Sequence, residues 1–344
     1  MKTFHIKGEY GRSSIYVGER LKNLKNYLPS SQTIIITDEN IKKYYRKEFP
    51  NVPVITIGTG EEIKTLATIE TILKKLMHYS CDRSSFIVGI GGGIVCDIVG
   101  FAASVFLRGV NFGFVSTSLL SQVDASVGGK NGVNLDFYKN MVGVFNQPEF
   151  VICDLDLLNT LPKKEISNGL AEIVKHALIL DKNMFDFIEE NSQKALSLDY
   201  DTIFRLVAES VKIKSQVVQQ DEKESHLRKK LNFGHTIGHA IEKIEKEGHG
   251  KAVAVGMLAA AKFSQARKLI SLEDVSRISS VLSDLNLQTE FDYNAEEIIL
   301  AASKDKKKQG NYLFYVFLEQ IGKAGVEKIS FDEMNKFIYS IFEK

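Results

Sequence analysis

The chain has little proline, and none of it lies in the second half. All five prolines precede residue 163, and the remaining 182 residues contain none. Glycine is distributed in the same way, because 16 of the 25 glycines precede residue 156. Proline interrupts helices, and glycine serves turns and close backbone approaches. The asymmetry predicts a turn-rich α/β part followed by a mostly helical part, with a boundary near residue 160.

Cysteine is scarce, and a large excess of one charge is absent. Cys81, Cys96 and Cys153 are odd in number and form no CxxC pair, which is typical of small buried side chains in a reducing compartment. The 44 Lys and Arg against 43 Asp and Glu leave a formal charge of +1. This balance lacks the electrostatic footprint of a nucleic-acid or membrane-surface binder. We therefore expect a cytoplasmic protein without a nucleic-acid or membrane partner.

Long uninterrupted hydrophobic runs are also missing. The most apolar stretch, residues 86–106, is broken by glycines and by Asp97, which favours a buried strand–turn–helix over a membrane span. The first ten residues, MKTFHIKGEY, lack the apolar segment of a secretory signal, so none is expected.

Short β-branched runs alternate with helical patterns in the first half, and amphipathic patterns dominate from residue 165. Strands are predicted over 33–38, 54–57, 85–90 and 111–115, and helices over 63–78, 94–106, 166–180, 201–220, 233–247 and 252–269. Strand–helix alternation is typical of a mainly parallel sheet that binds ligands outside the carboxyl ends of its strands. We predict an α/β domain over residues 1–160 and an all-α domain over residues 161–344.

Two glycine clusters are candidate anion sites. Gly91-Gly92-Gly93 follows an apolar strand, where backbone amides and a helix N-terminus favour a pyrophosphate, although a tight turn explains the run equally well. Its spacing is not the GxGxxG of the dinucleotide fingerprint. Gly128-Gly129-Lys130 adds a cation beside exposed backbone without the full GxxxxGK[ST] pattern. Together the clusters favour an anionic ligand.

Histidines are clustered, because five of the seven fall between residues 176 and 249. His235 and His239 are four residues apart and share a helix face, which nominates them as a metal pair, with His249 nearby. The HTIGH string lacks the Glu of HExxH, so the metalloprotease hypothesis fails. Glu172 is a candidate third ligand, but its spacing to Lys175 equally suits a helix-face ion pair.

Lysine and arginine residues surround these features. Singly, each is more typical of a solvated surface, whereas a small anionic substrate would need several of them to converge. The cations concerned are Lys130, Lys139, Lys175, Lys214, Arg228 and Lys306.

Three segments carry a resemblance to a known family. Ser121 to Lys130 (SQVDASVGGK), Leu231 to Ala240 (LNFGHTIGHA) and Asp305-Lys306-Lys307 are similar to motifs of 3-dehydroquinate synthase, a sugar-phosphate cyclase of the shikimate pathway. The resemblance runs over nearly the whole chain. It implies an N-terminal NAD-binding α/β domain, a C-terminal helical metal-binding domain, and a site in the cleft between them. It also implies a homodimer and one divalent metal, zinc or cobalt.

The reaction implied is the conversion of 3-deoxy-D-arabino-heptulosonate 7-phosphate to 3-dehydroquinate and phosphate. Its steps are NAD-mediated transient oxidation, phosphate elimination, re-reduction, ring opening and an intramolecular aldol addition, which makes the enzyme a carbon–oxygen lyase. The alternatives are a related cyclase of the 2-deoxy-scyllo-inosose or epi-valiolone type, a metal-dependent polyol dehydrogenase, and a non-catalytic descendant.

The resemblance also assigns roles to residues. It moves the metal ligands to Glu172, His235 and His249, and places His239 in the proton-transfer set. The implied catalytic and substrate residues are Glu224, His239, Lys175, Lys214, Arg228, Asn232, Asp124, Asn140 and Lys306. The implied cofactor-binding residues are Asp38, Gly60, Glu61, Lys64, Gly92, Gly93, Asp97, Thr117, Ser118, Lys130, Lys139 and Thr160.

The chain departs from the family pattern at Cys96, Asn131, Tyr138, His226 and Lys251. Lys251 stands where an acidic residue is usual, and a cation beside a metal ligand weakens metal binding unless it points away. None of the departures removes an implied metal ligand.

Overall fold

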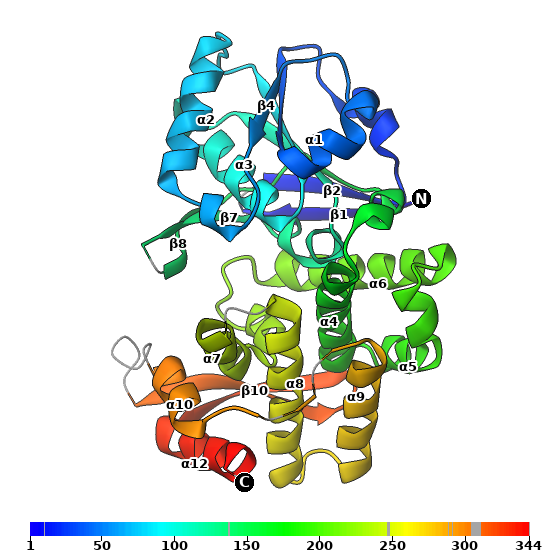
Figure 1. Ribbon diagram of the computed structural model, residues 1–344, viewed down its shortest axis with the longest axis vertical. Coiled ribbons are helices and arrows are strands. Elements are labelled where there is room, and N and C mark those ends of the chain that lie inside the picture. The colour runs from blue at the N-terminus through cyan, green and yellow to red at the C-terminus, as the bar shows by residue number, and fades with distance from the viewer. Residues whose placement is uncertain are drawn as a thin grey trace. The chain divides into compact units, whose positions relative to one another are not determined.

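The computed structural model describes residues 1–9, 11–136, 138–245, 248–287, 289–290, 292–303 and 311–343 (Figure 1). The chain forms two compact units. The first comprises Met1–Leu161 and Ile203–Glu222, and the second comprises Pro162–Thr202 and Lys223–Lys344. The proline and glycine distribution predicts one boundary near residue 160, whereas residues 203–222 belong to the same compact unit as the first part of the chain. The predicted assignment of cofactor and metal binding to residues 1–160 and 161–344 stays a prediction.

The first unit is built on a seven-stranded sheet with the order β1-β2-β9-β6-β5-β3-β4. Only β1 and β2 pair antiparallel among these neighbours, and the other pairs are parallel, so the mainly parallel sheet is confirmed. The strands are β1 (Lys2–Gly8), β2 (Gly11–Val17), β3 (Thr33–Asp38), β4 (Val54–Ile57), β5 (Phe86–Gly91), β6 (Asn111–Ser116) and β9 (Phe150–Cys153).

Three α-helices and a separate hairpin complete the first unit, together with residues 203–222, most of which belong to α6 (Tyr200–Gln220). They are α1 (Glu39–Tyr45), α2 (Leu66–His78), α3 (Gly93–Val105), and the antiparallel strands β7 (Lys130–Leu135) and β8 (Tyr138–Phe145). The helix predicted over 63–78 starts later, at Leu66, because Thr65 caps it by accepting a hydrogen bond from the Thr68 amide.

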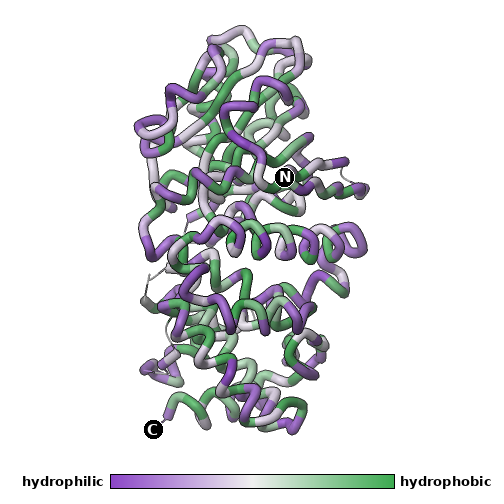
Figure 2. The backbone as a smooth tube through the Cα atoms, turned by 90° about the vertical axis from the view of Figure 1, so that its right-hand side faces the viewer, coloured by the Kyte–Doolittle hydropathy of each residue, from purple (hydrophilic) through white to green (hydrophobic). Residues whose placement is uncertain are grey.

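Burial explains why the central strands show no alternation of polar and apolar residues. Every residue of β5 is buried, and so are the first five residues of β3. A parallel strand covered on both faces loses the alternation of a half-exposed strand, because both sides pack against apolar side chains. In Figure 2 the helices show both hydrophilic and hydrophobic stretches, in keeping with one buried face and one solvated face.

The second unit is largely helical. Its helices are α4 (Lys163–Leu180), α5 (Lys182–Leu196), α7 (His235–Glu245), α8 (His249–Ala266), α9 (Leu272–Asp284), α10 (Ala295–Ser303) and α12 (Phe331–Phe342). No helix among the described residues has the length and apolar character needed to cross a membrane.

The second unit also contains a hairpin that the all-α expectation did not include. Strands β10 (Tyr312–Gln320) and β11 (Lys323–Ser330) pair antiparallel around a turn at Gly322, whose φ is +87°. The segment YLFYVFL is rich in aromatic and β-branched residues, which favour strands. The hairpin packs beside α8 (Figure 1).

Helix α8 is the centre of the second unit, where it contacts α4, α7, α9 and β10. Two glycines let its neighbours approach closely. A Cβ on Gly256 would lie 2.0 Å from the carbonyl oxygen of Gly234, and a Cβ on Gly250 would lie 2.4 Å from the Cα of Asn168 on α4. These approaches hold the start of α7 against the middle of α8, and the start of α8 against the first half of α4.

We expect Gly256→Ala to destabilise the protein by at least about 2 kcal/mol, because the added methyl meets rigid backbone rather than a flexible side chain. Gly238→Ala is the graded comparison: its Cβ would also meet backbone, but at 3.0 Å from the Ala252 carbonyl oxygen, so a smaller shift relieves the contact and we expect a smaller loss of stability. Thermal unfolding of both variants measures the difference. A melting temperature of Gly256→Ala equal to that of the unsubstituted protein would show that the close approach of α7 and α8 is not a constraint.

Candidate active site and metal centre

A buried ion pair lies in the middle of α4. Glu172 is 0% exposed and Lys175 is 2% exposed, and the lysine ammonium pairs with Oε2 of the glutamate one helical turn away. A charge taken out of water is costly unless it is paired and hydrogen-bonded. The pairing with Lys175 considered in the sequence analysis is therefore present, and Glu172 has further partners.

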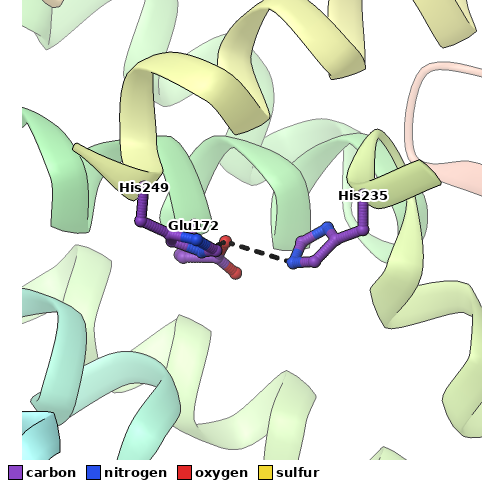
Figure 3. Close-up of side chains that lie close together, drawn as sticks. All are labelled: Glu172, His235 and His249. Atoms are coloured by element: carbon purple, nitrogen blue, oxygen red, sulfur yellow. Dashed lines mark hydrogen bonds and ion pairs between the residues drawn. The ribbon is translucent and has the colours of Figure 1, made fainter. Parts of the chain in front are cut away.

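Two histidine rings approach the same carboxylate (Figure 3). Nε2 of His249, the first residue of α8, lies 3.3 Å from Oε1 of Glu172, and Nε2 of His235, the first residue of α7, lies 3.8 Å from it. The donor atoms of the three residues lie within 4.8 Å of one another. Three different helices thus contribute one ligand atom each to one point.

The other ring nitrogens of both histidines have partners of their own. Nδ1 of His235 lies 3.1 Å from the Phe233 carbonyl oxygen, and Nδ1 of His249 lies 3.7 Å from Oε2 of Glu242 on α7. A partner at Nδ1 orients the ring and leaves Nε2 to act as the ligand. Glu242 is not among the residues predicted from the sequence, because no local pattern connects it to a histidine that follows in another helix.

The protonation states follow from these contacts. Burial and the nearby Lys175 charge lower the pKa of His235 to about 3. Burial alone would lower the pKa of His249, but its contacts with Glu172 and Glu242 outweigh burial and raise that pKa to about 10. Burial would raise the pKa of Glu172, yet Lys175 and His249 hold it well below its usual range. A divalent cation at this point would therefore replace one proton on His249.

The donor set fits a divalent metal. One carboxylate and two imidazoles are ligands that zinc and cobalt accept, and three protein ligands leave a position for water or substrate, as in catalytic sites. The i,i+4 spacing nominates His235 and His239 as the metal pair. Their ring centroids lie 5.0 Å apart, but the donor atoms grouped with Glu172 are those of His235 and His249. Two residues four apart on a helix share a face, but which of them lies close enough to act as a ligand depends on where the ligands from other helices lie.

His239 lines a cavity of about 540 Å³ in the second unit. Glu224, Asn232 and His235 line the same cavity, and Asn232 Nδ2 donates a hydrogen bond of 2.5 Å to Glu224 Oε1. A cavity of this size accommodates a small-molecule ligand. It brings together three of the residues assigned to proton transfer and substrate binding with one assigned metal ligand.

In the first unit, candidate cofactor residues lie at the carboxyl ends of three neighbouring parallel strands. Asp38 ends β3, the glycine run ends β5, and Thr117 follows β6. Dinucleotides bind at this edge of doubly wound sheets. The Asp38 side chain here caps α1, accepting from the Ile41 amide at 2.9 Å, and burial raises the pKa of this carboxyl.

The glycine run fits a phosphate group at the start of α3. Gly92 occupies the N-cap position of this helix, and Gly93 is its first residue. A Cβ on Gly93 would lie 2.9 Å from that of Ala125, and a Cβ on Gly92 would lie 3.3 Å from Oγ of Ser118. Backbone amides at a helix N-terminus without side chains in front favour an anion.

Two lysine-centred contacts join further candidate residues of the first unit. The buried Lys64 donates hydrogen bonds to Oδ2 of Asp97 at 2.5 Å and to Oδ1 of Asn140 at 2.6 Å. Lys214 donates to Asp124, reaching both its carbonyl oxygen and Oδ1 at 2.6 Å. Each lysine therefore already has acceptors that a bound ligand would share.

The remaining predicted residues are distributed over both units. Lys130 begins β7 and Lys139 lies on β8, Thr160 shares a 2.9 Å hydrogen bond with Tyr45, and Arg228 is buried in the turn Leu227–Asn232. Gly60 has a φ of +88° and precedes Glu61. Lys306 lies outside the described residues.

The family models and the sequence relatives agree on one family. The family model described as 3-dehydroquinate synthase N-terminal matches residues 54–168, and the model described as 3-dehydroquinate synthase C-terminal matches residues 169–308. The 3-dehydroquinate synthase of Thermoanaerobacter pseudethanolicus is 40% identical over 327 residues, which cover 92% of each chain.

Solved structures share the fold. A 2-deoxy-scyllo-inosose synthase complexed with carbaglucose-6-phosphate, NAD+ and Co2+ is similar with a TM-score of 0.87 at 27% identity, covering 98% of this chain and 100% of that one. A 2-epi-5-epi-valiolone synthase from Streptomyces hygroscopicus subsp. jinggangensis 5008, with NAD+ and Zn2+ bound, has a TM-score of 0.88 at 23% identity, covers 98% of each chain, and is evidence for the fold alone.

Removing one ligand of the trio should abolish tight metal binding. We expect Glu172→Gln and His249→Ala each to weaken zinc affinity by more than about 100-fold, the upper end of what loss of an outer-shell partner costs. Competition against a chromophoric chelator measures the affinity. His239→Ala is the matched control and should stay within about threefold of the unsubstituted protein. Loss of zinc in His239→Ala, with zinc retained in His249→Ala, would support the spacing-based pair instead.

The Asp97 carboxyl should lose its proton at an unusually high pH. Burial raises its pKa to about 6, although Lys64 acts to lower it. Since the folded pKa exceeds the unfolded pKa of about 3.9, Asp97 holds its proton more tightly in the native state than in the unfolded state. Stability from this group is thus present below about pH 4 and is lost as pH rises through about 6.

Carboxyl 13C NMR on the ligand-free protein checks this expectation. Lys64→Met should raise the Asp97 pKa further, because it removes the cation that favours ionisation. Asp82 is the internal control: hydrogen bonds from Ser84 lower its pKa below the usual range. An Asp97 midpoint at or below 4 would contradict the expectation.

Proposed function

The chain belongs to the 3-dehydroquinate synthase family, and from this premise we propose that it converts 3-deoxy-D-arabino-heptulosonate 7-phosphate to 3-dehydroquinate and phosphate, a step of the shikimate pathway. It is a carbon–oxygen lyase that uses NAD and one divalent metal ion, zinc or cobalt. The observation that carries the proposal is the convergence of Glu172, His235 and His249 in the unit that matches the family's C-terminal model.

The proposed metal ligands are these three residues. When bound, the metal polarises an alcohol oxygen of the substrate, while NAD takes up and later returns a hydride. Lys175 pairs with Glu172 and lowers the pKa of that carboxyl, which keeps it ionised. His239 is one helical turn from His235 and is proposed to move a proton at its ring nitrogen.

The substrate carries a phosphate and a carboxylate, so its proposed contacts are cations and amides. Arg228 and Asn232 lie in the turn before α7, and Asn232 also holds the carboxylate of Glu224. In the first unit, Lys214 is held by Asp124 and is proposed to bind the substrate's anionic groups. Charge-assisted hydrogen bonds of this kind hold phosphate and carboxylate groups strongly.

The cofactor contacts proposed for NAD are the strand ends and the glycine run of the first unit. Gly92 and Gly93 are proposed to bind the pyrophosphate through backbone amides at the start of α3. Glycine is needed at these positions because side chains there would meet Ser118 and Ala125. Asp97 and Lys64 are proposed to lie beside the bound nucleotide.

Two further properties are proposed from the family resemblance. The first is that the protein is a homodimer. The second is that it works in the cytoplasm, which agrees with the free state of Cys81, Cys96 and Cys153.

The test is a paired assay of phosphate and NADH. With NAD and zinc or cobalt, the purified protein should release phosphate from the heptulosonate phosphate while absorbance at the NADH band stays flat, because the hydride returns in each turnover. A chelator should abolish phosphate release, and added metal should restore it.

Glucose 6-phosphate is the control substrate, since its carba analogue is bound in the solved 2-deoxy-scyllo-inosose synthase. Phosphate release from it in preference to the heptulosonate would indicate the related cyclase. Stoichiometric NADH would indicate a polyol dehydrogenase. Release no faster than without enzyme, with metal and NAD bound, would exclude the proposed reaction.

A further inference from the structure

The hairpin of the first unit contains an irregularity next to two of the proposed ligand-binding residues. Val133 faces Val142 and Leu135 faces Tyr138, so the single residue Asn134 on β7 stands opposite residues 139–141 on β8. The additional residues form a bulge, a device that strands use beside functional sites to redirect side chains. The bulge contains Lys139 and Asn140, which the family resemblance assigns to cofactor and substrate.

The bulge bends at Asn140, whose φ is +52°. Among side-chain-bearing residues, asparagine tolerates this left-handed conformation best, but it still needs support from neighbouring contacts. The regular ladder is interrupted here, and the Asn140 amide instead donates a hydrogen bond of 2.8 Å to Oδ1 of Asn134. The Asn134 side chain therefore takes the place of the missing strand partner.

Asn134 also connects the hairpin to the segment before α2. Its Nδ2 donates to Oε1 of Glu61 at 2.8 Å, and its backbone amide donates to the Lys64 carbonyl oxygen at 2.8 Å. The Asn140 side chain completes the connection by accepting a hydrogen bond from Lys64 Nζ. One half-buried asparagine thus contacts Glu61, Lys64 and Asn140, three residues with assigned roles, while having no assigned role itself.

We propose that Asn134 is a positioning residue, which holds the 139–141 bulge against the Glu61–Lys64 segment and so places Lys139, Asn140 and Lys64 for their ligands. The importance for catalysis rests on the proposed function, but the positioning itself does not. A side-chain amide meets both demands, because its oxygen accepts from a backbone amide while its nitrogen donates to a carboxylate.

This donor–acceptor pattern allows a rescue experiment. Asn134→Asp keeps the acceptor for the Asn140 amide but sets a second carboxylate against Glu61, so the two groups repel. Glu61→Gln in the same chain supplies a donor and restores the contact with donor and acceptor exchanged. The four proteins of this cycle separate the coupling between the two positions from the separate effect of each change.

The first measurement is amide hydrogen exchange at Asn140, followed by NMR on the folded protein. We expect exchange to speed up about fivefold or more in Asn134→Ala, which corresponds to the loss of one typical hydrogen bond, and in Asn134→Asp. The double variant Asn134→Asp/Glu61→Gln should return most of the way to the original rate. Leu135→Ala is the matched control on the same strand, because its exposed side chain makes none of these bonds, and it should leave the rate unchanged.

The second measurement is NAD affinity by calorimetry together with kcat and KM for phosphate release. Asn134→Asp should weaken NAD binding about tenfold and raise the substrate KM. When the double variant is compared with Glu61→Gln alone, at least half of that loss of NAD affinity should be recovered. Unchanged Asn140 exchange in Asn134→Ala, or a double variant no better than Asn134→Asp, overturns the proposal. If the unsubstituted protein fails to release phosphate, the proposed function fails while the exchange data still decide the role of Asn134.

Discussion

The second unit depends on burying one carboxylate. Glu172 is out of contact with water on α4, and its charge is balanced by Lys175 and by the His249 ring. A buried charge without such partners would cost more than the surrounding packing provides. The segments that supply the partners must therefore meet at α4, and the absence of side chains at Gly250 and Gly256 lets the backbone approach closely enough. The metal-ligand geometry is a consequence of this convergence.

The first unit places its polar groups by a different means. Parallel strands expose their carboxyl ends at one edge, so residues far apart in sequence, such as Asp38 and Thr117, share that edge without contacting each other. Loops and a bulged hairpin then supply the charged groups: Lys64 is buried and pairs with Asp97, and Asn140 adds its amide oxygen. Here the sheet decides where ligands approach, and a few side-chain hydrogen bonds decide which groups meet them.

The secondary structure was predictable where a pattern is local. The strands expected over 33–38 and 54–57 coincide with β3 and β4, and the helix expected over 201–220 differs from α6 by one residue. His249 lies between the helices predicted over 233–247 and 252–269 but is the first residue of α8, because a helix start depends on capping and packing more than on periodicity. The β10–β11 hairpin was missed, since its aromatic run was set against a background of helical patterns.

The sequence by itself determined the α/β order of the first half, the helical character of the second and the family, and it predicts an anionic ligand. These properties are written in short windows of residues, in periodicity and in motifs. Spacing within one helix selects His239, and the family resemblance replaces it with His249, but only the tertiary structure gives the physical reason: His249 lies 77 residues from Glu172, and its ring approaches the carboxylate. A periodicity describes one helix at a time, and a metal site is formed by several, so its members are chosen by packing between elements distant in the chain.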